Sequence, residues 1–96
     1  MNFDEKQIAE LKAKHPGRSL FLISVDGKSC ILRSPTRQDL SYASVVKDPI
    51  KLNEVMLAQL WVAGDEDMKT DDDLFMAVCS KMDEVLKIKE AEIKKL

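Results

Sequence analysis

The dipeptide Asp26-Gly27 is the sequence feature that most limits how this chain can fold. It separates two apolar runs in the stretch SLFLISVDGKSCILR. Asp-Gly favours a two-residue β-turn, because both turn positions of a type I′ turn need positive φ. We therefore predict a β-hairpin over about residues 19–33. The predicted cross-strand pairs are Val25–Lys28, Ile23–Cys30 and Phe21–Leu32.

The two faces of this hairpin differ in polarity, since alternate residues of a strand point to opposite faces. One face is apolar and carries Phe21, Ile23, Val25, Cys30 and Leu32. The other face mixes Leu20, Leu22 and Ile31 with Ser24, Ser29 and Arg33. A lone hairpin is marginally stable in water, so we expect helices from the rest of the chain to cover the apolar face.

Capping residues, prolines and glycines predict four helices around the hairpin. A short N-terminal helix ends at Pro16-Gly17. The other three are predicted at about residues 35–46, 49–63 and 71–96. Together they predict a single α+β domain over residues 1–96, in which about 87–96 forms a charged helical extension.

The starts of these helices have specific sequence signals. The second helix begins either with Ser34 before a proline at the first helical position, or with Thr36 and Asp39 as a capping box. Asp48 caps the third helix, and Pro49 occupies its first turn, where the missing N–H is not needed. Gly64 is predicted to end the third helix, because glycine can adopt the left-handed conformation that follows many helices. The last helix is predicted to start with Thr70 as cap and Asp73 at its third position.

The helix predicted over residues 49–63 has two apolar stripes. One stripe consists of Leu52, Val55, Met56 and Leu60, and the other of Ile50, Leu57 and Trp61. A helix that is apolar over so much of its circumference is normally buried between other elements. The alternative is that the stripe with Trp61 docks on a partner helix. The candidate partner-binding residues are Ile50, Leu57 and Trp61, with Ile88, Ile93 and Leu96 in the extension.

The stretch from Asp65 to Asp73 has six acidic residues in nine positions, which raises the question of a calcium site. It lacks the ligand order, central glycine and final glutamate of an EF-hand loop. Aspartates at the start of a helix also interact favourably with the helix dipole. Helix capping therefore explains the acidic residues, and we predict no metal.

The sequence contains no recognisable catalytic set. His15 is the only histidine, and Cys30 and Cys79 stand singly among apolar residues, without the spacing of a zinc site. There is also no glycine-rich phosphate loop after a strand. We interpret both cysteines as reduced core thiols, and we predict a protein that is not an enzyme and needs no cofactor.

Composition excludes several classes of partner. The 15 basic and 17 acidic residues give a net charge of −2, which does not suit binding to nucleic acid. The N-terminus lacks the apolar segment of a signal peptide and no window reaches about 20 apolar residues, so we expect a cytoplasmic protein without a membrane span. A domain of 96 residues buries only about 60 to 65% of its unfolded surface. Binding to a protein partner or to another copy would therefore add to its stability.

Several short motifs resemble a known family. They are the run from Arg33 to Arg37, Tyr42, Asp48-Pro49, Gly64-Asp65, and the run from Asp72 to Phe75 followed by Ala77. Over about residues 19–96 the chain resembles small tail assembly chaperones of tailed bacteriophages, as encoded in prophages. The resemblance implies a non-enzymatic protein that binds the tape measure protein, and tail tube subunits, in the bacterial host. The alternative is a small regulatory or inhibitor-type protein-binding domain of bacterial origin.

Overall fold

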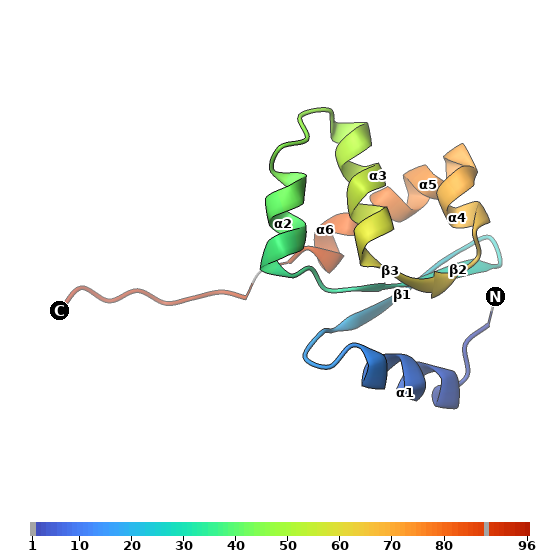
Figure 1. Cartoon of the computed structure of the whole chain (residues 1–96), viewed down its shortest axis with the longest axis horizontal. Coiled ribbons are helices and arrows are strands. Elements are labelled where there is room, and N and C mark those ends of the chain that lie inside the picture. The colour runs from blue at the N-terminus through green and yellow to red at the C-terminus, as the bar shows by residue number, and fades with distance from the viewer. Residues whose placement is uncertain (1, 88) are drawn as a thin grey trace.

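A three-stranded antiparallel sheet with the order β1-β2-β3 lies at the centre of the fold (Figure 1). The structure is a computed structural model that describes residues 2–87 and 89–96. The strands are β1 (Leu20–Val25), β2 (Lys28–Arg33) and β3 (Trp61–Gly64). Figure 1 shows α1 (Glu5–Lys14) on one side of this sheet and the later helices on the other. The predicted α+β class with one hairpin is confirmed, and the sheet has one strand more than predicted.

The hairpin has the predicted register. Its pairs include Val25–Lys28, Ile23–Cys30 and Phe21–Leu32. The two turn residues both have positive φ, 48° at Asp26 and 78° at Gly27. The Asp-Gly signal therefore located both the turn and the pairing of the strands.

The first helix, α1, covers the mixed face of the sheet. Asp4 and Gln7 form a capping box, in which Asp4 Oδ1 accepts from the Gln7 N–H at 2.7 Å and Gln7 Oε1 accepts from the Asp4 N–H at 3.0 Å. Ile8 and Leu11 are half-buried, but α1 has no fully buried residue. The helix is thus stabilised at its start by local bonds and is packed only loosely on the sheet.

Two further helices, α2 (Arg37–Ala43) and α3 (Pro49–Leu60), lie on the opposite side. Of the two predicted starts for α2, the capping box is the one formed, because Thr36 Oγ1 accepts from the Asp39 N–H at 3.2 Å and Asp39 Oδ2 accepts from the Thr36 N–H at 2.8 Å. Asp48 caps α3 by accepting from two backbone N–H groups. The predicted starts of both helices are confirmed.

The predicted end of the third helix was wrong. The helix ends at Leu60, and Trp61–Gly64 continue as β3, which pairs with β2. Gly64 does not end a helix: it has φ 145°, and a Cβ built on it would lie 2.5 Å from the Cys30 Cα atom. The glycine is therefore required by the close approach of two strands.

The start of the predicted last helix also differs from the prediction. The acidic stretch contains a short helix, α4 (Asp67–Thr70), before α5 (Asp72–Cys79). The N-cap of α5 is Asp71, which accepts from the Leu74 N–H at 3.0 Å, and Thr70 is the last residue of α4. The idea that acidic residues here cap a helix holds, but the capping residue is one position later than predicted.

The predicted continuous helix over residues 71–96 was also wrong. Helix α5 ends at Cys79, α6 comprises only Met82–Val85, and residues 89–96 have no helix. At the break, Ser80 Oγ donates to the Ala77 carbonyl at 2.6 Å, a local bond that competes with the helical ladder. Residues 89–96 are exposed, and a short helix without tertiary packing is marginal in water.

The core lies between the apolar face of the sheet and helices α3 to α6. Its buried residues are Ile23, Cys30, Leu32, Met56, Leu57, Leu60, Met68, Phe75, Val78, Met82 and Val85. The prediction that helices cover the apolar face of the hairpin is therefore confirmed. In the described part of the chain, no helix has the length and apolar character needed to cross a membrane.

Candidate functional site

The residues predicted to form a docking stripe do not share one surface. Leu57 is in the core with 2% of its surface exposed, whereas Ile50 near the start of α3 is 55% exposed. Trp61 is half-buried and belongs to β3 instead of the helix. Of the three stripe residues, only Ile50 remains well exposed.

The side chain of Trp61 contacts other parts of the same domain. Its side chain packs against the core, and the Lys69 ammonium lies 4.1 Å from the centre of its ring. This cation–π contact connects β3 to α4. The side chain is therefore engaged within the domain on two sides.

The predicted residues near the C-terminus are fully accessible where they are described. Ile93 and Leu96 have relative exposures of 99% and 109%. Ile88 lies outside the described residues. Figure 1 shows the segment 89–96 extending away from the body of the domain. These apolar side chains have no contact that would explain them as part of a core.

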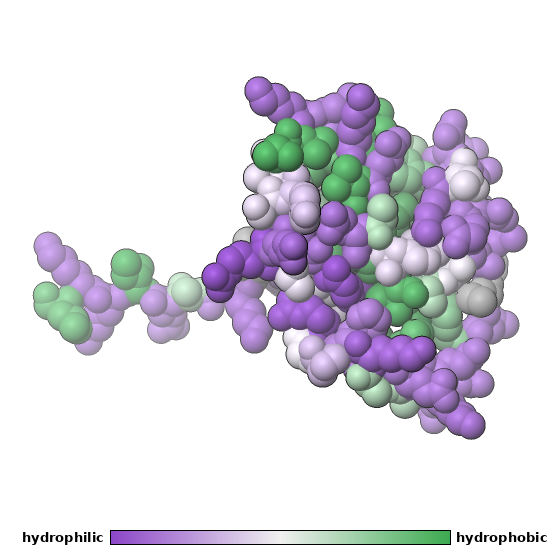
Figure 2. All heavy atoms as spheres, in the orientation of Figure 1, coloured by the Kyte–Doolittle hydropathy of each residue, from purple (hydrophilic) through white to green (hydrophobic). Residues whose placement is uncertain are grey.

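Four exposed apolar side chains belong to α2, to the start of α3 and to the chain between these two helices. We call this set the α2–α3 corner, and it consists of Leu40, Tyr42, Val45 and Ile50. Val45 is 76% exposed and Tyr42 is 55% exposed. Gln38 and Ser41 join these two residues in lining a shallow depression of about 470 Å³. Figure 2 shows apolar atoms, in green, at this end of the molecule among hydrophilic ones.

An ion pair positions the α2–α3 corner relative to the sheet. Arg33 at the end of β2 donates to both carboxylate oxygens of Asp39 in α2, at 2.6 and 3.2 Å. The same guanidinium donates to the Gln59 carbonyl in α3 at 3.0 Å. One side chain thus connects a strand to both helices of the corner.

The Asp39 carboxylate is strongly stabilised in its charged form. It is 4% exposed. The hydrogen bonds from Arg33 and then from Thr36 outweigh the effect of burial and lower the pKa of Asp39 to about 2. From the sequence, Asp39 was predicted only as a capping residue, and its pair with Arg33 was not predicted. The six-residue spacing between the two side chains carries no recognisable signal, because the pair depends on the path of the chain between β2 and α2.

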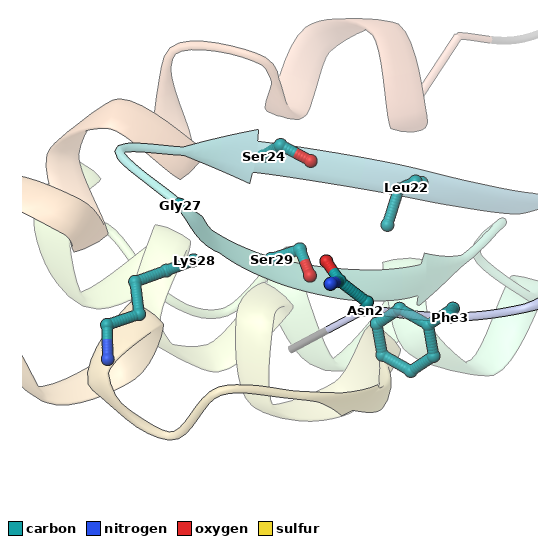
Figure 3. A pocket seen from close by; sticks show the side chains of 7 residues that line it. All are labelled: Asn2, Phe3, Leu22, Ser24, Gly27, Lys28 and Ser29. Atoms are coloured by element: carbon teal, nitrogen blue, oxygen red, sulfur yellow. The ribbon is translucent and has the colours of Figure 1, made fainter.

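The mixed face of the sheet has a second depression. It has a volume of about 330 Å³ and is lined by Asn2, Phe3, Leu22, Ser24, Gly27, Lys28 and Ser29. Figure 3 shows Asn2 and Phe3 lying over β2, while Leu22 and Ser24 belong to β1. Leu22 is 57% exposed. Among the lining residues that the structure describes, Lys28 alone is charged, so these residues offer no acid–base pair.

The acidic stretch is used for local contacts. Asp65 Oδ2 accepts from the Ser29 N–H at 3.0 Å, and Asp67 lies 3.0 Å from the Lys28 ammonium. These contacts attach the stretch to the second strand of the hairpin. Within residues 2–87 and 89–96, no group of three or more His, Cys, Asp or Glu side chains is placed to hold a metal ion.

Both cysteines have environments that disfavour the thiolate. Burial raises the pKa of Cys30 to about 11, and burial also raises the pKa of Cys79. The thiolate is the reactive form of cysteine. At neutral pH these side chains therefore behave as small apolar groups, in agreement with the sequence interpretation.

The residues that carry the family resemblance have structural roles here. Arg33 forms the ion pair, Asp48 and Pro49 start α3, and Gly64 permits close strand pairing. No family model, curated protein or solved structure matches this chain. The candidate site is thus the α2–α3 corner, which stands out by its exposed apolar side chains.

Proposed function

We propose that this protein is a non-enzymatic tail assembly chaperone of a tailed bacteriophage, which acts in the cytoplasm of the bacterial host. Its client is the tape measure protein, with tail tube subunits as a second partner. The observation that carries the proposal is the α2–α3 corner, where four large apolar side chains are exposed within an 11-residue stretch. The short motifs from Arg33 to Ala77 that resemble this family support it.

The corner has properties that suit a helical client. An amphipathic helix binds by placing its apolar face against an apolar surface of its partner. Tyr42 offers a large ring with a polar end, a side chain often found at the centre of interfaces. Lys47 and Lys51 are exposed beside it, whereas the Asp48 carboxylate is occupied by capping α3. We therefore expect the corner to favour an apolar helix face that is bordered by acidic residues.

A co-expression experiment tests this proposal. The full chain should keep a helical tape measure fragment in solution and should copurify with it. The double variant Val45→Asp, Ile50→Lys should weaken binding about 10- to 100-fold, because each change removes apolar contact area from the interface. Affinity can be measured by calorimetric titration of the purified fragment.

Met76→Lys is the matched control for this experiment. Met76 lies on α5 and is 57% exposed, close to the 55% of Ile50, so its replacement also removes an exposed apolar side chain. Binding by the control should be unchanged. Equal loss of binding in both variants would contradict the assignment of the corner, and no binding by the unmodified chain would contradict the chaperone function.

The alternative function is a small regulatory or inhibitor-type protein-binding domain. The same corner would then bind a different protein. Gene context distinguishes the two: a gene for a long tape measure protein beside this one is expected for the chaperone. A regulatory gene neighbourhood, together with no effect on the solubility of a tape measure fragment, would favour the alternative.

A further inference from the structure

Strand β1 (Leu20–Val25) is an edge strand without the usual protection. It lies at one end of the strand order, and among the described residues no strand pairs with its outer side. Its sequence LFLISV contains no charged residue and no proline. Edge strands of monomeric proteins commonly carry such residues, because a bare edge can pair with another chain.

The orientation of the backbone on this edge follows from the hairpin. The Ser34 N–H donates to the Ser19 carbonyl at 2.8 Å, so the backbone groups of Ser19 point towards β2. Residues of an antiparallel pair alternate between groups that point to the partner strand and groups that point away. The N–H and C=O groups that point to the open side therefore belong to Leu20, Leu22 and Ser24.

The open side of β1 is the wall of a trough. A cavity of about 410 Å³ is lined by Leu20, Phe21, Leu22, Ile23, Ser24, Lys81, Glu84 and Val85. A cavity of about 520 Å³ borders it, since Phe21 and Glu84 line both. Figure 3 shows the ribbon of the last helices on the side of β1 opposite to β2. A trough between a strand edge and a helix is the arrangement in which extended peptides add to a sheet.

We propose that this trough binds the segment 89–96 of a second copy of the chain as an added strand. In the structure this segment has no helix or strand, so its backbone is free to pair. Eight residues in extended form span about 26 Å, which exceeds the length of about 20 Å of a six-residue strand such as β1. The segment is therefore long enough to lie along the whole open edge.

The side chains of the segment also fit this role. Ile93 is 99% exposed in the monomer, and its neighbours Glu92 and Lys94 carry opposite charges. The trough likewise has both a basic residue, Lys81, and an acidic one, Glu84. Because both surfaces carry charges of both signs, we expect no overall electrostatic repulsion between them. Placing Ile93 against the apolar part of the trough would bury a side chain that otherwise has no contact.

The start of the segment lies at the trough itself. Lys89 and Glu90 line the second cavity together with Phe21, while Figure 1 shows the remainder running away from the domain. Two copies facing each other at this point can exchange their segments, each filling the trough of the other. This arrangement is a closed, two-fold pair and does not continue into a filament. The proposal does not depend on the identity of the client.

The molecular mass of the full chain in solution tests the proposal. Sedimentation equilibrium should show a concentration-dependent dimer. Leu22→Pro removes an N–H group on the open side without removing a bond to β2, and should raise the dimer dissociation constant at least about tenfold. Ile93→Asp should do the same, and it lies in an exposed segment where it cannot unfold the domain. Met76→Asp, which replaces a side chain on α5 that is as exposed as Leu22, should leave the dimer intact.

Amide hydrogen exchange provides a direct readout at the edge. The N–H of Leu22 should exchange rapidly at low concentration and become protected as the dimer forms, whereas the N–H of Ile23 is protected in both states by its pairing with β2. A chain that stays monomeric at high concentration would overturn the proposal. So would a dimer that persists unchanged in Ile93→Asp, because another surface would then hold it together.

Discussion

The two faces of the sheet are covered to very different degrees. On the face towards α3 to α6, Cys30 and Leu32 have no exposed surface and Ile23 is 7% exposed. On the face towards α1, Ile31 and Ser29 of β2 are buried, but Leu22 of β1 remains 57% exposed, and α1 itself buries no residue completely. The same hairpin thus contributes one surface to a closed core and one that is loosely covered along β1.

This difference indicates where the stability of the domain resides. Buried apolar area is the main favourable contribution to folding, so the core face and its helices should unfold together. Helix α1 shares little buried area with the rest, and such elements open locally at a lower free energy. Changes on the core side should therefore lower global stability, and changes in α1 should act locally.

The largest effect is expected at the junction of β2 and β3. Gly64→Ala would place a Cβ 2.5 Å from the Cys30 Cα and 2.6 Å from the Ser29 carbonyl oxygen. Both are backbone atoms of a central strand, so the new atom cannot be accommodated by rotating a side chain. We expect a loss of about 3–5 kcal/mol in the free energy of unfolding, measured by urea denaturation.

Gly17→Ala is the control for this substitution. Gly17 also has positive φ, 77°, but a Cβ at this position would meet no atom within 4 Å. Its replacement isolates the cost of the backbone conformation, about 1 kcal/mol. If both variants lost the same stability, close strand packing at Gly64 would not be the reason for the glycine.

The second effect concerns the connection of the core face to the α2–α3 corner. The pKa of Asp39, lowered to about 2 by Arg33 and Thr36, lies below the value of 3.8 for a free aspartate. A carboxyl group with a lowered pKa stabilises the fold above the unfolded pKa and loses this contribution as the pH falls through the folded pKa. We expect about 2 kcal/mol to be lost between about pH 4 and pH 2.

Urea denaturation at a series of acidic pH values measures this loss. In Asp39→Asn the contribution of this carboxylate to the free energy of unfolding should be absent already at neutral pH. The free energy of unfolding should then fall less steeply between about pH 4 and pH 2. Asp72→Asn, a change at an exposed aspartate, should retain the steep dependence. An unchanged acid profile in Asp39→Asn would show that other carboxylates cause it.

Local signals explain what could be predicted from the sequence. The turn at Asp26-Gly27 and the caps at Thr36 and Asp48 involve residues within a few positions of each other, and all three were predicted. Strand β3 was missed because its partner, β2, is about 30 residues away and its sequence WVAG continues an apolar helix pattern. Tertiary pairing outweighed helix propensity there.

The candidate site was harder to predict for the same reason. Leu57 and Ile50 were placed on one stripe, but only the packing of α3 against the sheet determines that Leu57 is buried. Tyr42 and Val45 belong to the stretch predicted as the second helix. Their exposure was not predicted, and the Arg33–Asp39 pair that connects α2 to β2 has no local sequence signal.

The smallest effect is expected on the loosely covered face. Asp4→Ala removes the acceptor for the Gln7 N–H and disrupts the capping box of α1, which should destabilise that helix by about 1 kcal/mol. Because α1 has no fully buried residue, its amide protons should exchange about five- to tenfold faster while the urea midpoint of the whole domain stays nearly constant.

The comparable cap of α3 provides the contrast. Asp48→Ala removes the acceptor for two N–H groups of a helix that contributes Met56 and Leu60 to the core, so the same kind of change should shift the global midpoint. A similar global shift in both variants would mean that α1 unfolds together with the core, and that the two faces of the sheet are more tightly coupled than their burial indicates.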